Sequence, residues 1–378
     1  MTFLFLLYAG FCVYTYALFP LILHVRARWA SARDPGETLD AASAAELPSV
    51  SIVVAAHDEA ATLPTKLASL AALDYPSGRL ETIIVSDGST DATRAILEAA
   101  AVGNPALRVL HYEPAAGKPT ALNAGVAAAT GDVLVFMDAR QTVSANAVRA
   151  LVARLRDPAV GAASGELVLS GDDGEAASVG LYWRYEKWIR LAESRLFSTT
   201  GATGALYAIR REHWVPHLPD VLLDDFETPV HLLRRGLRTV FEPAARAFDR
   251  AESDVDGEFR RKVRTLAGNY QSFARHTWLF DPSENPVWWQ FLSHKVFRLL
   301  VPYALIGALV TAALGDTAFL DAMLWLQVAF YGVGLAGLAG LGGRASGLVR
   351  TFVQLNAAAV VGAWRYATGG ASVRWRRS

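Results

Sequence analysis

Acidic side chains follow several short apolar runs of the chain, at positions where they could act as bases or as ligands of a cation. Glu59 comes after the run 50–56, Asp87 after the next run, and Asp138 ends a later one. Carboxylates serve as general bases and as oxygen ligands of Mg²⁺ or Mn²⁺. Carboxylates that converge on one edge of a sheet repel one another unless a cation, a base or polar ligand groups lie beside them. For any single carboxylate, the alternative to a functional role is a place on a solvated acidic rim.

Basic side chains accompany these carboxylates. The candidates are Lys118, Arg140, Arg261 and Arg264. The last two are three residues apart on a helix predicted over 257–278, so they share one face. Guanidinium groups suit a diphosphate because they are planar, multidentate donors. The alternatives are an outward surface charge for Arg140 and a lipid-facing basic patch for residues 260–264.

The sequence pattern predicts the elements that would position these side chains. Short apolar strands alternate with helical stretches, which is typical of an α/β fold with a mostly parallel sheet covered by helices. The predicted strands are 50–56, 81–86, 107–111 and 133–138. Helices are expected to begin near Ala61, after the capping residue Asp91, and at Lys118. Ligands of such sheets bind beyond the carboxyl ends of the strands, which is where the acidic residues lie.

Composition and absent motifs exclude several classes of function. The chain has 378 residues with 36 Lys+Arg and 36 Asp+Glu, so no global positive field exists to hold nucleic acid. Cys12 is the only cysteine, which excludes an internal disulfide framework and a multi-cysteine metal site. The sequence contains no GxGxxG fingerprint after the first predicted strand, no GxxxxGKS/T loop and no HExxH pair. It therefore predicts neither a dinucleotide cofactor nor a P-loop site.

Long apolar runs predict a membrane protein. Hydrophobic residues make up 52% of the chain and charged residues only 19%. Residues 3–25 contain no Asp, Glu, Lys or Arg, and a helical span needs about 20 apolar residues. No basic n-region precedes this run and no small-residue cleavage signal follows it, so we expect a retained anchor rather than a signal peptide. Arg26 and Arg28 follow at once, so the positive-inside rule predicts that the N-terminus lies outside. The runs 299–315 and 322–343 predict a transmembrane hairpin with an outer acidic turn, and the alternative is buried core helices.

Shorter segments are predicted to lie along the membrane surface. Segment 351–364 is too short for a full span and leads into a basic tail, so we expect it at the cytoplasmic interface, with a fourth span as the alternative. Segments 181–197 and 283–297 mix aromatic and basic residues, which favours the interface over core packing. The predicted organisation is an anchor over 1–25, a linker over 26–48, an α/β domain over 49–280, an interfacial helix over 281–298, a transmembrane hairpin over 299–343, and a membrane-associated segment with a basic tail over 344–378.

A series of motifs resembles the processive-type membrane branch of glycosyltransferase family 2, which includes hyaluronan, chitin and cellulose synthases. The motifs are 51–59 (SIVVAAHDE), 85–91 (VSDGSTD), 117–123 (GKPTALN), 136–140 (FMDAR), 203–207 (TGALY), 223–225 (LDD) and 261–265 (RKVRT). Each motif is weak alone, and their order carries the resemblance. It covers about residues 48–300 with the anchors, and it implies a GT-A fold with a Rossmann-like sheet.

The resemblance implies roles in binding the donor. The loop after the first strand would hold the base of a UDP-sugar, with His57 at the uracil and Glu59 near the ribose or base. Asp87 would accept a hydrogen bond from the uracil imide, and Lys118 would bring a cation near the nucleotide.

A metal motif is part of the same resemblance. Asp138 occupies the first position of a DxD motif, whose carboxylates hold Mg²⁺ or Mn²⁺ against the diphosphate. Arg140 stands at the third position. Either Asp138 holds the metal with water and phosphate oxygens, or Arg140 itself neutralises part of the diphosphate charge. Arg261 and Arg264 would contact the diphosphate as well.

The catalytic residues follow from the resemblance too. Asp225 falls at the position of the family's catalytic carboxylate, and it opens the predicted helix 226–235, whose dipole favours an ionised carboxylate. Asp225 would be the general base and Asp224 its neighbour, with helix capping as the alternative for both. Gly204 and Tyr207 belong to a motif that looks like the family's acceptor loop. A single displacement would invert the anomeric centre.

The function expected from these features is a membrane-bound, inverting glycosyltransferase that uses a UDP-sugar in polysaccharide synthesis. Its location would be a bacterial-type inner membrane, with several spans and a cytoplasmic catalytic domain. The alternatives are transfer of one sugar to a lipid-linked acceptor and a non-catalytic nucleotide-sugar-binding scaffold. The expected partners are the UDP-sugar, a saccharide or lipid-linked acceptor, membrane lipids and, for export of a polymer, a second copy of the chain or secretion proteins. No nucleic acid is expected.

Overall fold

The chain forms two compact units in a computed structural model, which describes residues 1–30, 47–170, 174–250, 255–338, 341 and 343–371. The sheet unit contains the described residues of 32–169 and 197–250. The helical unit contains those of 1–31, 170–196 and 251–371. Residues 31–46 of the predicted linker and residues 372–378 of the predicted basic tail lie outside the described residues.

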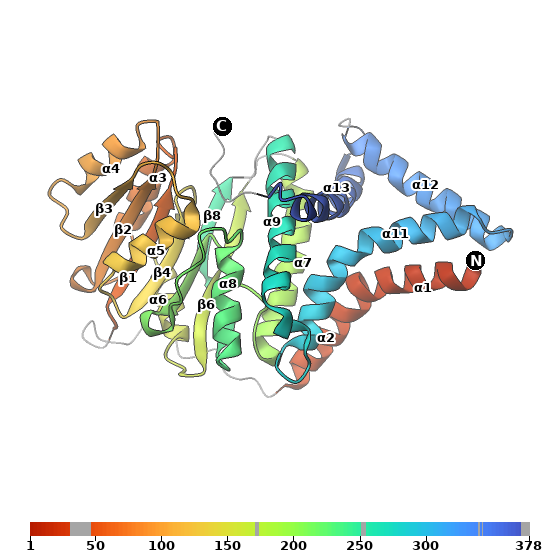
Figure 1. The fold of residues 1–378 in the computed structure, drawn as a ribbon, viewed down its shortest axis with the longest axis horizontal. Helices are drawn as coiled ribbons and strands as arrows, with labels where there is room; N and C mark the ends of the chain where they lie inside the picture. The colour runs from red at the N-terminus through yellow and green to blue at the C-terminus, as the bar shows by residue number, and fades with distance from the viewer. Residues whose placement is uncertain (31–46, 171–173, 251–254, 339–340, 342, 372–378) are drawn as a thin grey trace. The chain divides into compact units, whose positions relative to one another are not determined.

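The sheet unit is built on a mixed sheet (Figure 1), in which the described residues form eight strands. The strands are β1 Val50–Ala56, β2 Leu80–Asp87, β3 Leu107–Tyr112, β4 Val133–Asp138, β5 Thr142–Val143, β6 Val160–Ser170, β7 Leu206–Arg210 and β8 Arg238–Arg250. Their order is β3-β2-β1-β4-β7-β6-β8-β5. The pairs β1–β2, β1–β4 and β2–β3 are parallel, and β7 joins β4 antiparallel. The predicted α/β fold is thereby confirmed.

Helices cover both faces of the parallel strands. They are α3 Leu63–Ala71, α4 Thr93–Ala101, α5 Lys118–Ala128, α6 Ala147–Arg154 and α8 Asp224–Arg234. Ile52 and Val54 of β1 belong to one core cluster, with residues of α3, α4 and α6. Val53 and Ala55 belong to a second cluster, with residues of α5 and α8. Every residue of β1 is buried, as a parallel strand covered on both faces requires.

Among its described residues, the helical unit contains three helical runs that are long and apolar enough to span a membrane: Thr2–Trp29, Trp288–Ala313 and Ala318–Leu338. The first consists of α1 Thr2–Val13, η1 Tyr14–Leu18 and α2 Phe19–Trp29. The second consists of α10 Trp288–Gln290, η7 Phe291–Val296 and α11 Phe297–Ala313, and the third is α12 Ala318–Leu338. The three apolar helices are those that the sequence predicted.

Residues 288–298, part of the predicted interfacial helix 281–298, continue into α11 as one helical run, Trp288–Ala313. Their place at the membrane interface stays a prediction. No proline or glycine interrupts residues 288–297, and the π-helical turn η7 keeps the helical path continuous. The apolar helix therefore begins about three turns before the predicted span.

Three further helices belong to the helical unit: α7 Gly174–Leu196, α9 Val255–Arg275 and α13 Gly343–Ala367. α7 packs on α2 and α13, and α9 also packs on α13. The predicted α/β domain 49–280 includes α7 and α9, whereas their contacts group them with the apolar helices. α13 contains the segment 351–364, whose place at the interface stays a prediction.

A buried charged cluster links α7 to the run Trp288–Ala313. Nδ1 of His294 lies 2.7 Å from Oε1 of Glu193, and Nε2 of His294 lies 3.2 Å from Oε2 of Glu186. Arg298 pairs with Glu186 as well. Burial by itself would raise the pKa of Glu186, but Arg298 and His294 hold it well below its ordinary value. Buried charges require such partners, so the polar residues of α7 help to hold the helices together.

Candidate active site

Three predicted site residues meet at the carboxyl end of β4. Asp138 ends β4, Lys118 begins α5 and Asp224 begins α8. Nζ of Lys118 lies 2.8 Å from Oδ1 of Asp138 and 3.2 Å from Oδ1 of Asp224. The side chains of Asp138 and Asp224 are 35% and 10% exposed. One ammonium group thus joins the carboxylate of a strand end to the carboxylate of a helix N-terminus.

This bridge shifts the pKa values of Lys118 and Asp224. Burial by itself would lower the pKa of Lys118, but the carboxylates of Asp138 and Asp224 outweigh it and raise the pKa well above its ordinary value. Burial by itself would raise the pKa of Asp224, but the ammonium of Lys118 lowers it. Asp224 is therefore an ionised partner of Lys118, and a carboxylate held in this way is a weaker base.

Asp225, the predicted base, contacts the predicted acceptor loop. Its Oδ2 accepts a hydrogen bond of 3.1 Å from the main-chain N–H of Gly204, and its carbonyl accepts one of 2.9 Å from that of Ala202. A Cβ atom at Gly204 would lie 3.0 Å from Oδ2 of Asp225, so the close approach depends on glycine. The structure thus brings two predicted functional residues together, although their roles stay predictions.

Asp87 ends β2 and accepts two main-chain hydrogen bonds from the loop before α5. Its Oδ1 lies 2.7 Å from the nitrogen of Ala116, and its Oδ2 lies 2.7 Å from the nitrogen of Gly117. Gly88 follows with φ 64°, and a Cβ atom there would lie 2.5 Å from the nitrogen of Ala115. Asp87 therefore fixes the start of α5 and with it Lys118. Its predicted contact with uracil stays a prediction.

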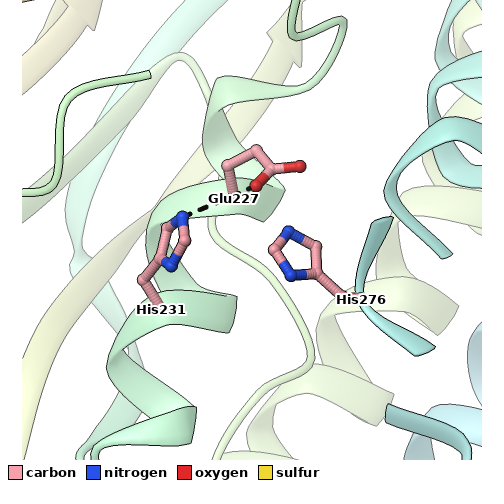
Figure 2. Close-up of side chains that lie close together, drawn as sticks. All are labelled: Glu227, His231 and His276. Carbon is pink, nitrogen blue, oxygen red and sulfur yellow. Dashed lines mark ion pairs between the residues drawn. The ribbon is translucent and has the colours of Figure 1, made fainter. Parts of the chain in front are cut away.

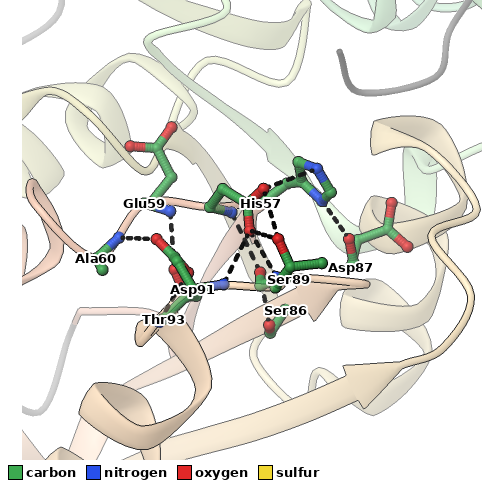
Figure 3. A network of polar contacts seen from close by, with 10 residues as sticks. His57, Glu59, Ala60, Ser86, Asp87, Ser89, Asp91 and Thr93 are labelled. Carbon is green, nitrogen blue, oxygen red and sulfur yellow. Dashed lines mark hydrogen bonds and ion pairs between the residues drawn. The ribbon is translucent and has the colours of Figure 1, made fainter. Parts of the chain in front are cut away.

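His57 ties the loop after β1 to the loop after β2 (Figure 3), and Asp58 joins the same two loops. Nδ1 of His57 lies 2.6 Å from the carbonyl oxygen of Asp87. Oδ1 of Asp58 accepts hydrogen bonds from the main-chain N–H groups of Thr90 at 2.6 Å and Asp91 at 3.3 Å. Asp58 has φ 53°, a conformation that Asp adopts more readily than most residues. The two loops that would face the base of a donor are thus joined.

Glu59 completes this network. Its main-chain N–H donates to Oγ1 of Thr93 at 2.8 Å, and its Oε2 accepts a hydrogen bond of 2.6 Å from Thr62 (Figure 3 shows the first of these). Burial raises the pKa of Glu59, while the hydroxyl of Thr62 and the charge of Arg140 act against the rise. The predicted place of Glu59 near the ribose or base of the donor stays a prediction.

Arg140 pairs with Asp249, a residue that sequence reasoning missed. Nη2 of Arg140 lies 2.5 Å from Oδ2 of Asp249, and Nε2 of Gln141 donates to the same oxygen at 2.9 Å. Asp249 lies on β8, which pairs antiparallel with β5. The partner is 109 positions away in the sequence, so only the register of the two strands could have revealed it. Arg140 is thus held by a buried carboxylate rather than turned outward alone.

A buried lysine lies against the same loop. Nζ of Lys66, on α3, donates to the carbonyl oxygen of Gln141 at 3.0 Å and lies 3.6 Å from Sδ of Met137. Burial lowers the pKa of Lys66 from 10.5 to about 8. Sequence reasoning missed this residue because lysine on an amphipathic helix is expected to face solvent.

The helix that carries Asp225 also carries a titratable pair. Figure 2 shows Glu227 and His231 on successive turns of α8, with 3.7 Å between Oε2 and Nε2. Glu227 is buried. Sequence reasoning missed this pair, although its spacing of four residues on a helix could have indicated it.

The remaining predicted residues are one buried tyrosine of the sheet unit and two arginines of the helical unit. Tyr207 is fully buried, and its ring stacks on Phe136 with 4.8 Å between ring centroids. Contact with an acceptor would require this ring to be exposed. Arg261 and Arg264 lie on α9 of the helical unit with exposed side chains, and their contact with a diphosphate stays a prediction.

The carboxylate of Asp138 suits Mg²⁺ or Mn²⁺. Mg²⁺ is usually held by one or two carboxylates and completes its shell with water and substrate phosphate oxygens. Asp138 is partly exposed at a strand end, and Asp224 shares its ammonium partner. The residues present therefore fit a divalent ion, with a guanidinium group in the third position of the motif.

The fold and the acidic loops at the strand ends define a GT-A-type α/β protein. Residues 51–214 match the family described as Glycosyl transferase family 2. The chain belongs to this family, as its motifs predicted.

Two relatives support this membership. An N-acetylglucosaminyltransferase of Bradyrhizobium elkanii is 36% identical over 128 residues, which cover 33% of this chain and 69% of that protein. The Beta-monoglucosyldiacylglycerol synthase of Synechocystis sp. is 37% identical over 123 residues, which cover 32% of this chain and 26% of that protein. Other curated relatives match over longer stretches at 28% identity, and this chain spans 56% to 59% of their length.

One solved structure resembles almost the whole chain. It is the mannosyltransferase PcManGT from Pyrobaculum calidifontis, in complex with GDP-Man and Mn²⁺. The TM-score is 0.74 at 24% sequence identity, and the match covers 96% of this chain and 99% of that one. This likeness shows the fold.

Proposed function

We propose that this protein is a membrane-bound, inverting glycosyltransferase that transfers a sugar from a UDP-sugar to form a β-glycosidic bond in polysaccharide synthesis. The observation that carries the proposal is the Lys118 bridge, which joins Asp138 of the metal-type motif to the helix that begins with Asp224 and Asp225. Membership of glycosyltransferase family 2 and a relative named N-acetylglucosaminyltransferase support sugar transfer.

The reaction requires a base on one side of the sugar and charge stabilisation on the other. Asp225 would take the proton of the acceptor hydroxyl, whose oxygen then attacks the anomeric carbon. The bond between that carbon and the diphosphate oxygen breaks, and the nucleoside diphosphate leaves with the bonding electrons. One displacement inverts the anomeric centre. Gly204 supports this role because its N–H group holds the Asp225 carboxylate at the acceptor loop.

The donor would be held by the loops at the strand ends. His57, Glu59 and Asp87 are the residues proposed for the nucleoside, and the hydrogen bonds of Figure 3 keep their loops together. Lys118 and Arg140 are proposed for the diphosphate, because ammonium and guanidinium groups stabilise developing phosphate charge. Arg261 and Arg264 are proposed for the same group.

A divalent cation, Mg²⁺ or Mn²⁺, is proposed at Asp138. When bound, it would act as a Lewis acid that neutralises charge on the leaving diphosphate. The structural neighbour in complex with GDP-Man and Mn²⁺ supports a divalent ion, and it makes GDP-sugars the donors to test beside UDP-sugars.

The test is release of nucleoside diphosphate by the purified full chain in detergent. A panel of UDP-sugars and GDP-sugars is supplied with Mn²⁺ or with EDTA, together with saccharide and lipid acceptors. We expect release from one UDP-sugar and a loss of kcat of about 10²–10⁴-fold in Asp225→Asn, the usual contribution of a general base. UDP binding by this variant should be unchanged. Asp220→Asn, at an exposed position before α8, is the control.

A second candidate function is transfer of one sugar to a lipid-linked acceptor. The relative named Beta-monoglucosyldiacylglycerol synthase favours it. Mass spectrometry of the products separates the two: a polymerase makes long saccharides, whereas a single transfer adds one sugar mass to a lipid. UDP binding without release from any donor, and without an effect of Asp225→Asn, would instead support a non-catalytic scaffold.

Location and partners belong to the same proposal. The three apolar runs support a membrane protein, for which we propose several spans in a bacterial-type inner membrane and a cytoplasmic sheet unit. Export of a polymer would require a second copy of the chain or secretion partners.

A further inference from the structure

We propose that Asp249 is a positioning residue that holds the guanidinium of Arg140 at the diphosphate of the donor, where other members of the family have a second motif carboxylate. The inference rests on the proposed function, because it concerns the donor of that same site. It adds a residue from β8 that none of the sequence motifs contains.

The pair is fixed by the register of two strands. β5 and β8 pair at Thr142 with Phe248 and at Val143 with Ala247. The next step along both strands brings Gln141 opposite Asp249, and Nε2 of Gln141 donates to Oδ2 of Asp249 at 2.9 Å. Asp249 therefore reaches the loop after β4 through backbone pairing, which makes its position independent of any bound ligand.

The burial of the pair indicates a built arrangement. The side chain of Asp249 is 8% exposed and that of Arg140 is 29% exposed. A buried carboxylate is costly unless a cation and hydrogen-bond donors compensate it, and here Arg140 and Gln141 donate to one oxygen. Arg140 uses Nη2 for this pair. The pair thus joins a buried carboxylate to a guanidinium group that is partly exposed.

The charge of Arg140 acts on the residues proposed for the donor. Arg140 is two positions after Asp138, on the loop that ends β4. Its charge also acts on Glu59 of the loop after β1, where it opposes the rise in pKa that burial causes. Asp138 and Glu59 both lie at the carboxyl ends of parallel strands, where ligands of such sheets bind.

Lys66 supports the same loop from the protein interior. Its ammonium donates to the carbonyl oxygen of Gln141 at 3.0 Å, and the residue is fully buried. The loop between Asp138 and Thr142 is therefore held by Lys66 through its backbone and by Asp249 through its side chains. Groups that act on a leaving group are effective when they are held in place before the reaction.

The arrangement changes the charge that a nucleotide meets. A carboxylate at position 140 would add one negative charge and depend on a metal ion to bind phosphate. Arg140 adds one positive charge and binds phosphate oxygens directly. We therefore expect nucleotide binding to persist in part without a divalent ion.

The test measures binding of UDP and GDP to the purified full chain by calorimetry, with Mn²⁺ and with EDTA. We expect Asp249→Asn to raise the Kd of the bound nucleotide about tenfold in EDTA, the loss of one charge-assisted contact. In assays with a donor, KM should rise and kcat should fall as well, because Arg140 is proposed to stabilise charge that develops on the leaving diphosphate. Glu242→Gln is the matched control, because Glu242 lies on the same strand, is 9% exposed and pairs with Arg154. This control should bind nucleotide within about twofold of the wild type.

A double variant tests the charge argument in the opposite direction. Arg140→Asp places a carboxylate at the third position of the motif. Asp249→Asn removes the buried carboxylate that would otherwise repel it. Nucleotide binding by the double variant should require Mn²⁺, and electron paramagnetic resonance should detect more bound Mn²⁺ than in the wild type. If Asp249→Asn does not fold, Arg140→Lys, which keeps the charge but lacks the planar donors, should show the same tenfold loss.

The outcomes separate this inference from the proposed function. Binding of neither nucleotide by the wild type would overturn both. Unchanged binding by Asp249→Asn, or wild-type binding that EDTA abolishes as completely as in the double variant, would overturn the role of Asp249 and leave the proposed function standing. An equal loss in Glu242→Gln would also overturn it, because the effect would then be structural.

Discussion

At the scale of single residues, the candidate site is organised by cations that each serve more than one partner. Lys118 contacts Asp138 and Asp224, and Arg140 contacts Asp249 while its charge acts on Glu59. Compensation by cations was expected from the converging carboxylates. Lys118 holds Asp224, whereas the carboxylate of Asp225 accepts a hydrogen bond from Gly204 of the proposed acceptor loop.

Lys66 provides a prediction about pH. The pKa of Lys66 is about 8 in the folded protein, whereas an ordinary lysine, such as Lys66 in the unfolded chain, has a pKa of 10.5. Between pH 8 and pH 10.5, the unfolded chain therefore binds a proton that the folded chain does not. Stability should therefore rise with pH across this window. The variant Lys66→Met has no lysine at this position, so its stability does not rise in this way. Its free energy of unfolding minus that of the wild type should therefore fall by on the order of 2 to 3 kcal/mol from about pH 7 to about pH 10.5. Urea unfolding in detergent, followed by tryptophan fluorescence, measures the difference.

The control for this prediction is Lys262→Met. Lys262 is partly exposed on α9 and pairs with Glu258 at 2.8 Å. Its substitution shows what removal of a partly exposed lysine does to stability over the same pH range. A Lys66→Met difference that changes with pH no more than the Lys262→Met difference would show that the buried ammonium does not lose its proton in this window.

Some site residues could be predicted from the sequence and others could not. Asp138 and Lys118 were predictable because they stand at the end of a strand and the start of a helix, which local pattern reveals. Asp249 and Lys66 were not, because one depends on the register of strands far apart in the sequence and the other on a lysine turned inward. Local pattern predicts the position of a side chain along its element but not its distant partner.

At the scale of elements, the loops after β1 and β2 form one polar unit through Asp58. Its carboxylate accepts two main-chain hydrogen bonds from the second loop, while its own backbone has φ 53°. Both features depend on the same residue. The loop after β1 would face the donor base, so this link connects backbone conformation to nucleotide binding.

Substitutions of Asp58 should separate the two contributions. Asp58→Asn keeps an acceptor and tolerates positive φ, Asp58→Gly keeps only the conformation, and Asp58→Ala keeps neither. We expect stability to fall in that order, with a cost of about 1–3 kcal/mol for Ala. UDP affinity should fall in the same order. Thermal unfolding and calorimetry check both, and an alanine variant as stable as the asparagine variant would contradict the proposed link.

The elements themselves were largely predictable, because strands buried on both faces and charge-free helices leave strong patterns. β1 and β4 have the predicted bounds. The continuity of Trp288–Ala313 was not predicted, because the aromatic and basic residues 283–297 look like an interfacial segment. His294 of this segment is buried, because Glu186 and Glu193 of α7 supply the carboxylates that pair with its ring.

At the scale of the whole molecule, membrane orientation follows from charge asymmetry around the apolar runs. Arg26 and Arg28 follow the first charge-free stretch, and Arg344 and Arg350 follow the third. The turn between α11 and α12 contains Asp316 and no basic residue. Basic residues accumulate on the cytoplasmic side, so we expect this turn outside and the sheet unit inside.

The sequence offers a direct measurement of this orientation, because Cys12 is its only cysteine. In a Cys12→Ser background, Asp316→Cys places a thiol in the turn between α11 and α12, and Ser77→Cys places one at an exposed position of the sheet unit. A membrane-impermeant maleimide added to intact spheroplasts should label the first variant and leave the second unlabelled. After permeabilisation both should react, which controls for thiol accessibility. Labelling of Ser77→Cys in intact spheroplasts would place the sheet unit outside, where cytoplasmic UDP-sugars do not reach it, and the proposed donor would then have to be abandoned.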